Sequence, residues 1–369
     1  MVLAASGLLA LAGAWTWVRL HPPQLKAERH LRERLQVGVD GRVDLVVEAR
    51  APRTVTTAIS DAFDRGRRSA RFLLAPLEGG ETARAAYRIP TDRRGRYELG
   101  PLRATVSDPF GLASRTRRLL SSEEVIVYPR VHHVLPPPER SGTELDRDQP
   151  RAHGRLDSGG EFLTLREYVP GDDLRRVHWR STARRDRLMM RQNEARHRSP
   201  MLLMLDVRPG AHDRPSFERA VEACASIATA LERTARPWEL VLSTGIAVGA
   251  PGRRHIVSVM DELAVVAPHG PDRIVAAMTR RRTSALVAVM GRVQGEDGGA
   301  LGVLVRNGGS LTVVATFDDW AVAPMRTRRL RPMFIPFGPN QPFVSAWNTA
   351  VLRWQRSARH HSSDSHAPA

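Results

Sequence analysis

The sequence contains little lysine, cysteine or aromatic character, and each shortage excludes some functions. Lys26 is its single lysine, so the formal charge of +17 comes almost wholly from arginine. Such exclusive use of arginine points to genome base composition rather than to a nucleic-acid surface, and the charge is weak evidence about partners. The single cysteine, Cys224, excludes an internal disulfide framework and a multi-cysteine zinc site, and it suits a reducing compartment.

Complete catalytic motifs are also missing. There is no Gly-x-x-x-x-Gly-Lys-Ser/Thr loop for ATP hydrolysis, and none of the 13 histidines has the His-Glu-x-x-His spacing of a zinc helix. The stretch "LSTG" (242–245) lacks the glycines of a nucleophile elbow. Scattered arginine pairs with few interleaved aromatics disfavour a groove for single-stranded nucleic acid. We therefore expect no enzyme activity, no cofactor and no bound metal.

The first twenty residues form the longest apolar run of the sequence, and no comparable run follows. This run predicts a transmembrane helix over 1–20. Residues 2–18 carry no charge and nearly cross a hydrocarbon core of about 30 Å. Trp15 and Trp17 suit the headgroup layer, and the basic juxtamembrane segment 21–41 follows. These cations predict a single-pass protein of the cell membrane with its C-terminal domains in the cytoplasm. One alternative is a secretory signal peptide, although the segment lacks the positive n-region of such a peptide. Another is that a further helix upstream has been lost.

The middle of the chain predicts two architectures. Short strand-like runs separated by glycine and proline turns predict a β-sandwich-like domain over 42–135. Residues 136–160 are rich in proline, glycine and charge, and they predict a linker. Beyond it, the buried strand "MLLMLDV" (201–207) and alternating strands and helices predict a doubly wound α/β domain over 199–340. In that domain we expect helices over 215–235, 257–266, 272–281 and 300–309. Residues 341–369 predict a C-terminal helix and a disordered tail from about 357.

Three stretches resemble the bacterial family called domain of unknown function 58. They are "RRGRYELGPLRATVSDPFGL" (93–112), "VYPR" (127–130) and "LREYVPGDDLRRVHWRSTARRDRLMMR" (165–191). The resemblance implies N-terminal membrane helices, a β-rich region, a signature segment over 161–198 and a von Willebrand factor A-like α/β domain. It also implies a functional association with a MoxR-type AAA+ ATPase and a transglutaminase-like membrane protein. Members usually have two membrane helices, whereas this chain shows one.

The signature segment combines a turn with alternating charges. Pro170-Gly171 suits a type II turn, and Asp172 or Asp173 can cap a helix that runs through Arg184. Arginine guanidinium groups bind carboxylates through two hydrogen bonds and stack on indole rings. The segment therefore predicts a rigid structural element, here called the bracket, that docks the linker and β-domain onto the α/β domain. Its members are Arg166, Tyr168, Asp172, Asp173, Arg175 and Trp179. A partner-binding surface is the alternative, and catalysis by the two aspartates is disfavoured because adjacent arginines keep them ionised.

Asp206 stands where a magnesium-binding von Willebrand factor A domain begins its Asp-x-Ser-x-Ser motif. This chain has Val207, Arg208, Pro209 and Gly210 after it, so both serines are replaced. Arg208 places a cation where a ligand should lie. We expect a degenerate site that binds no divalent ion tightly.

Two functions remain open from the sequence. The first is a membrane-anchored protein-interaction module that works with a MoxR-type ATPase. The second is a basic protein that binds nucleic acid or another anionic surface through its net charge, and nucleic acid is the less favoured partner. An enzyme ranks third.

Overall fold

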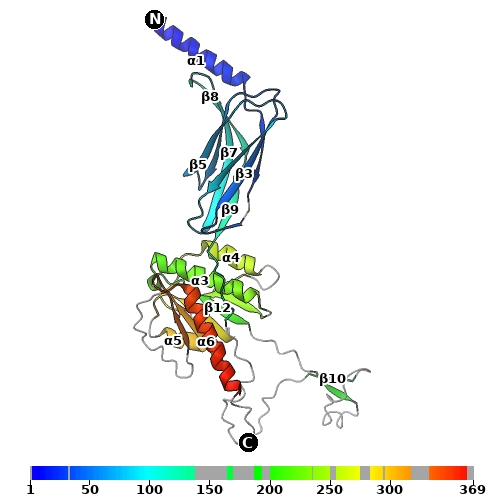
Figure 1. Cartoon of the computed structure of the whole chain (residues 1–369), viewed down its shortest axis with the longest axis vertical. Helices are drawn as coiled ribbons and strands as arrows, with labels where there is room; N and C mark the ends of the chain where they lie inside the picture. Colours follow the sequence, from blue (N-terminus) through cyan, green and yellow to red (C-terminus); the bar gives the residue numbers. More distant parts are fainter. Residues whose placement is uncertain are drawn as a thin grey trace.

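The computed structural model shows an elongated molecule built from a helix, a pair of packed β-sheets and a helix-covered sheet, in that order (Figure 1). It describes residues 2–31, 34–137, 164–168, 187–192, 200–234, 236–249, 255–274, 283–293, 296–316 and 332–363. The packed sheets lie between α1 (Val2–Leu20) and the helix-covered sheet.

The N-terminal prediction of a transmembrane helix was wrong, and with it the prediction of a single-pass membrane protein. None of the described helices combines the length and the hydropathy that crossing a bilayer requires. The helix α1 has 19 residues, and Ala, Gly and Ser occupy many positions where bulky aliphatic residues would raise its hydropathy. Its last turn also contains Arg19. An uncharged run was therefore insufficient evidence for a span.

Two sheets form the β-sandwich. The first has the order β1-β3-β6, with β1 (Leu25–His30), β3 (Gly41–Ala49) and β6 (Thr82–Ile89) antiparallel. The second has the order β2-β9-β7-β4-β5, and β8 pairs with β7 outside this path. Its strands are β2 (Arg34–Gln36), β4 (Thr57–Phe63), β5 (Arg68–Leu74), β7 (Gly95–Ser107), β8 (Ser114–Leu120) and β9 (Glu123–Tyr128).

Alternation of side chains builds the core between the two sheets. Val43, Leu45 and Val47 are buried, while Asp44 between them points outward, as the two-residue period of a strand requires. The same alternation begins at Leu25 in β1. The segment 21–41, expected as a basic juxtamembrane stretch, therefore contains two strands of the sandwich, because its charges alternate with buried residues.

A buried ion pair crosses the sandwich. Arg29 Nη2 donates to Asp61 Oδ1 at 2.7 Å, and Arg29 Nε donates to Asp61 Oδ2 at 3.1 Å. Tyr87 donates its hydroxyl to the same carboxylate. Both charged side chains are almost fully buried. The pair joins β1 to β4 and the hydroxyl joins β6 to β4, so one carboxylate links both sheets.

The helix-covered sheet has six strands in the order β14-β13-β12-β15-β16-β17. All its pairs are parallel except that of β14 with β13. The strands are β12 (Met201–Leu205), β13 (Trp238–Leu242), β14 (Ala247–Val248), β15 (Thr283–Met290), β16 (Val305–Ala315) and β17 (Met333–Pro336). Helices α3 (Arg214–Glu232), α4 (His255–Val265) and α6 (Phe343–Ser363) pack on one face, and α5 (Asp297–Leu304) packs on the other.

Side chains of β12 alternate between the two faces of this sheet. Met201, Leu203 and Leu205 join the core beneath α3 and α6, whereas Leu202 and Met204 join the core beneath α5. A strand that is buried on both faces has to be apolar at every position, which explains the uninterrupted run "MLLML".

The predicted fold class was wrong. The described chain is largely β-sheet, its first helix does not qualify as a membrane span, and a von Willebrand factor A-like fold is not shown. The helix expected over 300–309 is divided, because α5 ends at Leu304 and β16 begins at Val305. Most of the helix expected over 272–281 lies outside the described residues. In the expected disordered tail, α6 continues to Ser363, since no proline or glycine interrupts it.

Replacing Asp61 tests the importance of the buried pair. We expect Asp61→Ala to lower the opening free energy of the sandwich by about 3–5 kcal/mol, because Arg29 would remain buried with only the exposed Glu123, at 3.7 Å, as a counter-charge. Native-state hydrogen exchange in β3 and β4 measures this change. Asp44→Ala removes an exposed partner of Arg42 and should change exchange little. Equal effects of the two substitutions would contradict this role.

Candidate functional site

The carboxyl end of the parallel sheet is the first place to seek a site. The chain leaves β12 to form β13 on one side and later returns to form β15 on the other, so the strand order reverses between β12 and β15. Open parallel sheets bind ligands at such a point, beyond the carboxyl ends of the strands. Asp206 follows β12 there, and Gly291 follows β15. Asp206 was considered from the sequence as a position of a metal site.

Arg208 bridges two carboxylates at this point. Its Nε and Nη2 atoms each donate to Asp206 at 2.9 Å, one to each carboxylate oxygen. Its Nη1 and Nη2 atoms donate to Asp297 in α5 at 2.9 and 3.0 Å. The exposed fractions of the three side chains are 1%, 0% and 5%, in the order Arg208, Asp206, Asp297. The guanidinium group therefore uses both of its edges on buried carboxylates.

Opposing effects act on the charge of Arg208. Burial alone would lower the pKa of Arg208, but the hydrogen bonds and the negative charges of Asp206 and Asp297 outweigh burial and raise it. Arg208 therefore stays protonated, and two carboxylates share one positive charge. Its desolvation is offset only while both partners are present.

Close packing leaves little room around this cluster. The short helix η2 (Pro209–Ala211) lies against the end of β15, where a Cβ atom at Gly291 would be 2.0 Å from the carbonyl oxygen of Ala211. The Arg292 amide donates to the same carbonyl at 2.8 Å. On the other side, the Gly210 amide donates to Asp272 at 2.8 Å. Glycine at 291 thus allows the loop after β12 to close over the sheet edge.

These residues do not fit a divalent metal. Hard cations need oxygen ligands, and the oxygens of Asp206 and Asp297 are already directed at a guanidinium group. In the part of the chain that the structure describes, no group of three or more His, Cys, Asp or Glu side chains could hold a metal ion. The interpretation of Asp206 and Arg208 as a degenerate metal-site position stays a prediction.

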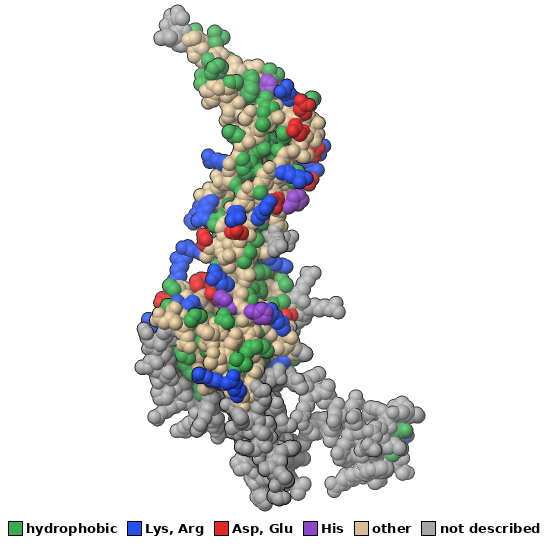
Figure 2. Space-filling view, in the orientation of Figure 1, with side chains coloured by type: hydrophobic (Ala, Val, Ile, Leu, Met, Phe, Trp, Pro, Cys, Tyr) green, Lys and Arg blue, Asp and Glu red, His purple; other side chains and the backbone are tan. Residues whose placement is uncertain are grey.

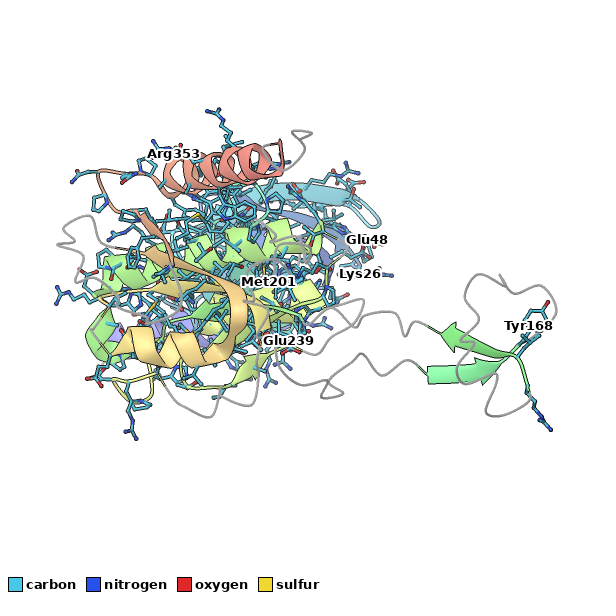
Figure 3. The ribbon with its side chains drawn as sticks, turned by 90° about the horizontal axis from the view of Figure 1, so that it is seen from below. Lys26, Glu48, Tyr168, Met201, Glu239 and Arg353 are labelled. Carbon is cyan, nitrogen blue, oxygen red and sulfur yellow. The ribbon has the colours of Figure 1, made fainter. Side chains whose placement is uncertain are left out.

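The signature residues are only partly described. Arg166 lies in β10 (Thr164–Glu167), which pairs antiparallel with β11 (Met189–Gln192). The Tyr168 amide donates to the carbonyl oxygen of Leu188 at 2.9 Å. Figure 1 shows this two-stranded ladder away from the body of the molecule, and Figure 3 shows Tyr168 beside it. The other members lie outside the described residues, so their docking role remains a prediction: Pro170, Gly171, Asp172, Asp173, Arg175, Trp179 and Arg184.

Residues that received no role from the sequence join the sandwich to the helix-covered sheet. Arg94 binds both carboxylate oxygens of Glu218 in α3, at 2.8 and 3.2 Å, and donates to the carbonyl oxygen of Leu263 in α4 at 2.7 Å. Its guanidinium group also lies 5.6 Å from the centre of the Phe217 ring. Arg94 falls within the stretch 93–112 quoted for the family resemblance, and this was the sequence feature that could have identified it as a functional residue.

The strand β9 and the segment after it complete this junction. The Tyr128 hydroxyl donates a hydrogen bond to Asp261 in α4 at 2.6 Å. Burial raises the pKa of Tyr128 most, and this hydrogen bond raises it further. The indole of Trp347 in α6 donates to the carbonyl oxygen of Leu135 at 2.7 Å. Asn348 accepts from the Leu135 amide at 2.9 Å. Hydrogen bonds from both sides therefore fix the orientation of the two units.

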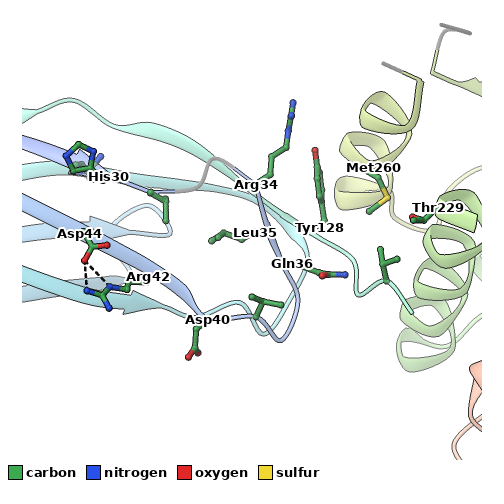
Figure 4. Close-up of a pocket in the computed structure, with 14 residues that line it drawn as sticks. His30, Arg34, Leu35, Gln36, Asp40, Arg42, Asp44, Tyr128, Thr229 and Met260 are labelled. Carbon is green, nitrogen blue, oxygen red and sulfur yellow. Dashed lines mark hydrogen bonds and ion pairs between the residues drawn. The ribbon is translucent and has the colours of Figure 1, made fainter. Parts of the chain in front are cut away.

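A cavity of about 920 Å³ lies beside the junction. Figure 4 shows Leu35, Gln36 and Tyr128 on the sandwich side, and Thr229 and Met260 on the helices opposite them. Its walls come from both units, so its shape depends on the contacts of Arg94 and Tyr128.

Comparison with known proteins confirms one part of the sequence interpretation. A family model described as protein of unknown function DUF58 matches residues 164–307, which confirms the resemblance to that family over this range. Membrane anchoring and a von Willebrand factor A-like domain gain no support from this match. No curated protein matches the chain.

Some solved structures share a weak likeness with this chain. The CARDB domain of the PF1109 protein from Pyrococcus furiosus, solved with di-metal ions, is 15% identical, with a TM-score of 0.24, over 29% of this chain and 94% of that one. A cohesin module from Clostridium perfringens is 18% identical, with a TM-score of 0.21, over 29% and 98%. A β-glucosidase from Listeria innocua is 13% identical, with a TM-score of 0.18, over 28% and 16%. These scores are too low to carry an argument about function.

Removing Arg208 tests the charge balance at the sheet edge. We expect Arg208→Ala to lower the free energy of unfolding by about 3–5 kcal/mol, because two buried carboxylates would lose their shared counter-charge. Urea denaturation measures this loss. Arg214→Ala, an exposed change in the first turn of α3, is the control and should have little effect.

Magnesium titration tests the degenerate site directly. Calorimetry on the unmodified chain should detect no micromolar binding, because Arg208 occupies both carboxylates. Micromolar binding that disappears in Asp206→Ala would overturn the degenerate-site interpretation.

Replacing Arg94 tests the junction. We expect Arg94→Ala to weaken the contact between the two units by about 1.5–3 kcal/mol, since it removes charge-assisted hydrogen bonds. Spin labels on the two units should then report a broader distance distribution. Arg96→Ala removes a nearby exposed pair with Glu124 and should leave the distribution unchanged. A distribution as narrow in Arg94→Ala as in Arg96→Ala would show that other contacts hold the units.

Proposed function

We propose that this chain is a non-catalytic protein-interaction module. The observation that carries the proposal is the Asp206–Arg208–Asp297 cluster at the carboxyl edge of the parallel sheet. Catalytic groups at such an edge need free carboxylates, hydroxyls or metal ligands that can reach a substrate. Here both carboxylates are buried and hydrogen-bonded to Arg208, so they stabilise the edge and are not free to reach a substrate.

The junction supports a binding role as well. Arg94 and Tyr128 fix the sandwich against α3 and α4. A fixed orientation lets one partner contact both units without a further loss of conformational freedom, which favours affinity. The resemblance to the domain of unknown function 58 points to a MoxR-type AAA+ ATPase as that partner. A transglutaminase-like membrane protein is the other partner that it suggests.

Binding to a purified MoxR-type ATPase tests this function. We expect the full chain to bind with a dissociation constant of about 10 μM or tighter in biolayer interferometry. Arg94→Ala should weaken binding about tenfold, because a mobile junction adds an ordering cost, whereas Arg96→Ala should not. The absence of binding up to about 100 μM would exclude this partner. Enzymatic turnover that is lost in Asp206→Ala would contradict the non-catalytic role and show that the protein is an enzyme.

The second and less favoured candidate is a protein that binds nucleic acid or another anionic surface through its net charge of +17. Filter binding separates the two candidates. DNA affinity that falls steeply with salt would favour this candidate, and no binding at low salt would exclude it.

A further inference from the structure

Three arginines form a row across the outer face of the larger sandwich sheet. Cα pairing places Arg71 of β5 opposite Ser60 of β4, Ser60 opposite Arg103 of β7, and Arg103 opposite Arg118 of β8. All three arginines are exposed. Neighbouring strands lie about 4.8 Å apart, so Arg103 is one strand from Arg118 and two strands from Arg71.

The neighbouring row confirms which way these side chains point. Thr105 of β7 and Thr116 of β8 share a hydrogen bond of 2.9 Å between their hydroxyl oxygens on the exposed side. Arg103 and Arg118 each lie two residues from one of these threonines and therefore project from the same face. We call Arg71, Ser60, Arg103, Arg118, Thr105 and Thr116 the arginine face.

The arginine face carries three positive charges at exposed positions. Within the described ranges, no carboxylate forms an ion pair with Arg71, Arg103 or Arg118. Like charges directly opposite one another destabilise a pair of strands, and Arg103 is opposite Arg118. The row thus opposes folding, and a negatively charged partner would relieve this repulsion.

The outer face of the smaller sheet is different. Three of its cations pair with carboxylates, namely Lys26 with Glu28, Arg42 with Asp44, and Arg88 with Asp40, whereas Arg84 has no ion pair among the described residues. In Figure 2, blue and red side chains mix along one margin of the sandwich, and the margin beside β5 is mainly blue. Cations without an ion pair in the described residues are therefore concentrated on the larger sheet, at Arg71, Arg103 and Arg118, although Arg96 of that sheet does pair with Glu124.

We propose that the arginine face binds an acidic protein segment, and this inference rests on the proposed role as an interaction module. Guanidinium groups bind carboxylates through two parallel hydrogen bonds. The residues between the arginines are small or carry hydroxyls, so an extended segment can approach the sheet closely. Ser60, Thr105 and Thr116 add hydrogen-bonding groups beside the three cations.

Nucleic acid fits the face less well. Single strands bind on aromatic platforms, and no residue of the arginine face is aromatic. Duplex binding commonly uses about 6–10 phosphate contacts, whereas this row offers three arginines. Charge number and side-chain type together favour carboxylates over phosphates.

A decaglutamate peptide tests the proposal with the full chain. The variant Arg71→Gln, Arg103→Gln, Arg118→Gln removes three charges from the arginine face. The control Arg42→Gln, Arg84→Gln, Arg88→Gln removes three charges from the smaller sheet. At low salt we expect the first variant to bind the peptide at least about tenfold more weakly and the control less than about twofold more weakly. The first variant should also melt at a higher temperature than the control, because it loses repulsion whereas the control loses ion pairs.

Other outcomes would overturn the proposal. Equal losses in both variants would mean that net charge alone attracts the peptide. Tighter binding of a 20-base-pair DNA duplex, lost in the first variant only, would assign the face to nucleic acid.

If the first variant binds the MoxR-type ATPase as the unmodified chain does, the face is not that docking surface and the interaction role stands. If the peptide binds selectively but no ATPase does, the assigned partner fails and the carboxylate chemistry stands.

Discussion

The placement of Arg208 between Asp206 and Asp297 is the interaction on which the helix-covered unit depends. It ties the end of β12 to α5 across the point where strand order reverses. Because all three side chains are almost fully buried, none of the charges is tolerable without the others. The cluster occupies the position where a sheet of this kind would hold a ligand.

The sandwich uses the same chemistry for a different purpose. Arg29 and Asp61 are also buried, and together with Tyr87 they link its two sheets. At the junction, Arg94 pairs with Glu218, whose side chain is partly exposed. On the arginine face, three further guanidinium groups have no ion-pair partner in the described part of the chain. Arginine therefore has structural roles where carboxylates surround it and offers a binding surface where they do not.

The local predictions that succeeded depended on periodicity and local turn chemistry. The helix expected over 215–235 is α3 (Arg214–Glu232), and Asp213 caps it by accepting from the Ser216 amide. The strand β12 lies within the continuous apolar run. The prediction at the N-terminus failed because an uncharged run of small residues resembles a membrane span in composition but lacks sufficient hydropathy. Segment 21–41 was misjudged because its charges concealed an alternating strand pattern.

The sequence by itself determined the strand periods, the lack of complete catalytic motifs and the presence of a cation two residues after Asp206. Only the tertiary structure decided which carboxylates neutralise which arginines. That pairing depends on residues distant in the chain, such as Arg208 and Asp297, which meet only when the sheet and α5 have packed. Local spacing contains no information about such distances. The row of Arg71, Arg103 and Arg118 likewise arises from strand register, which the hydrogen-bonded sheet fixes.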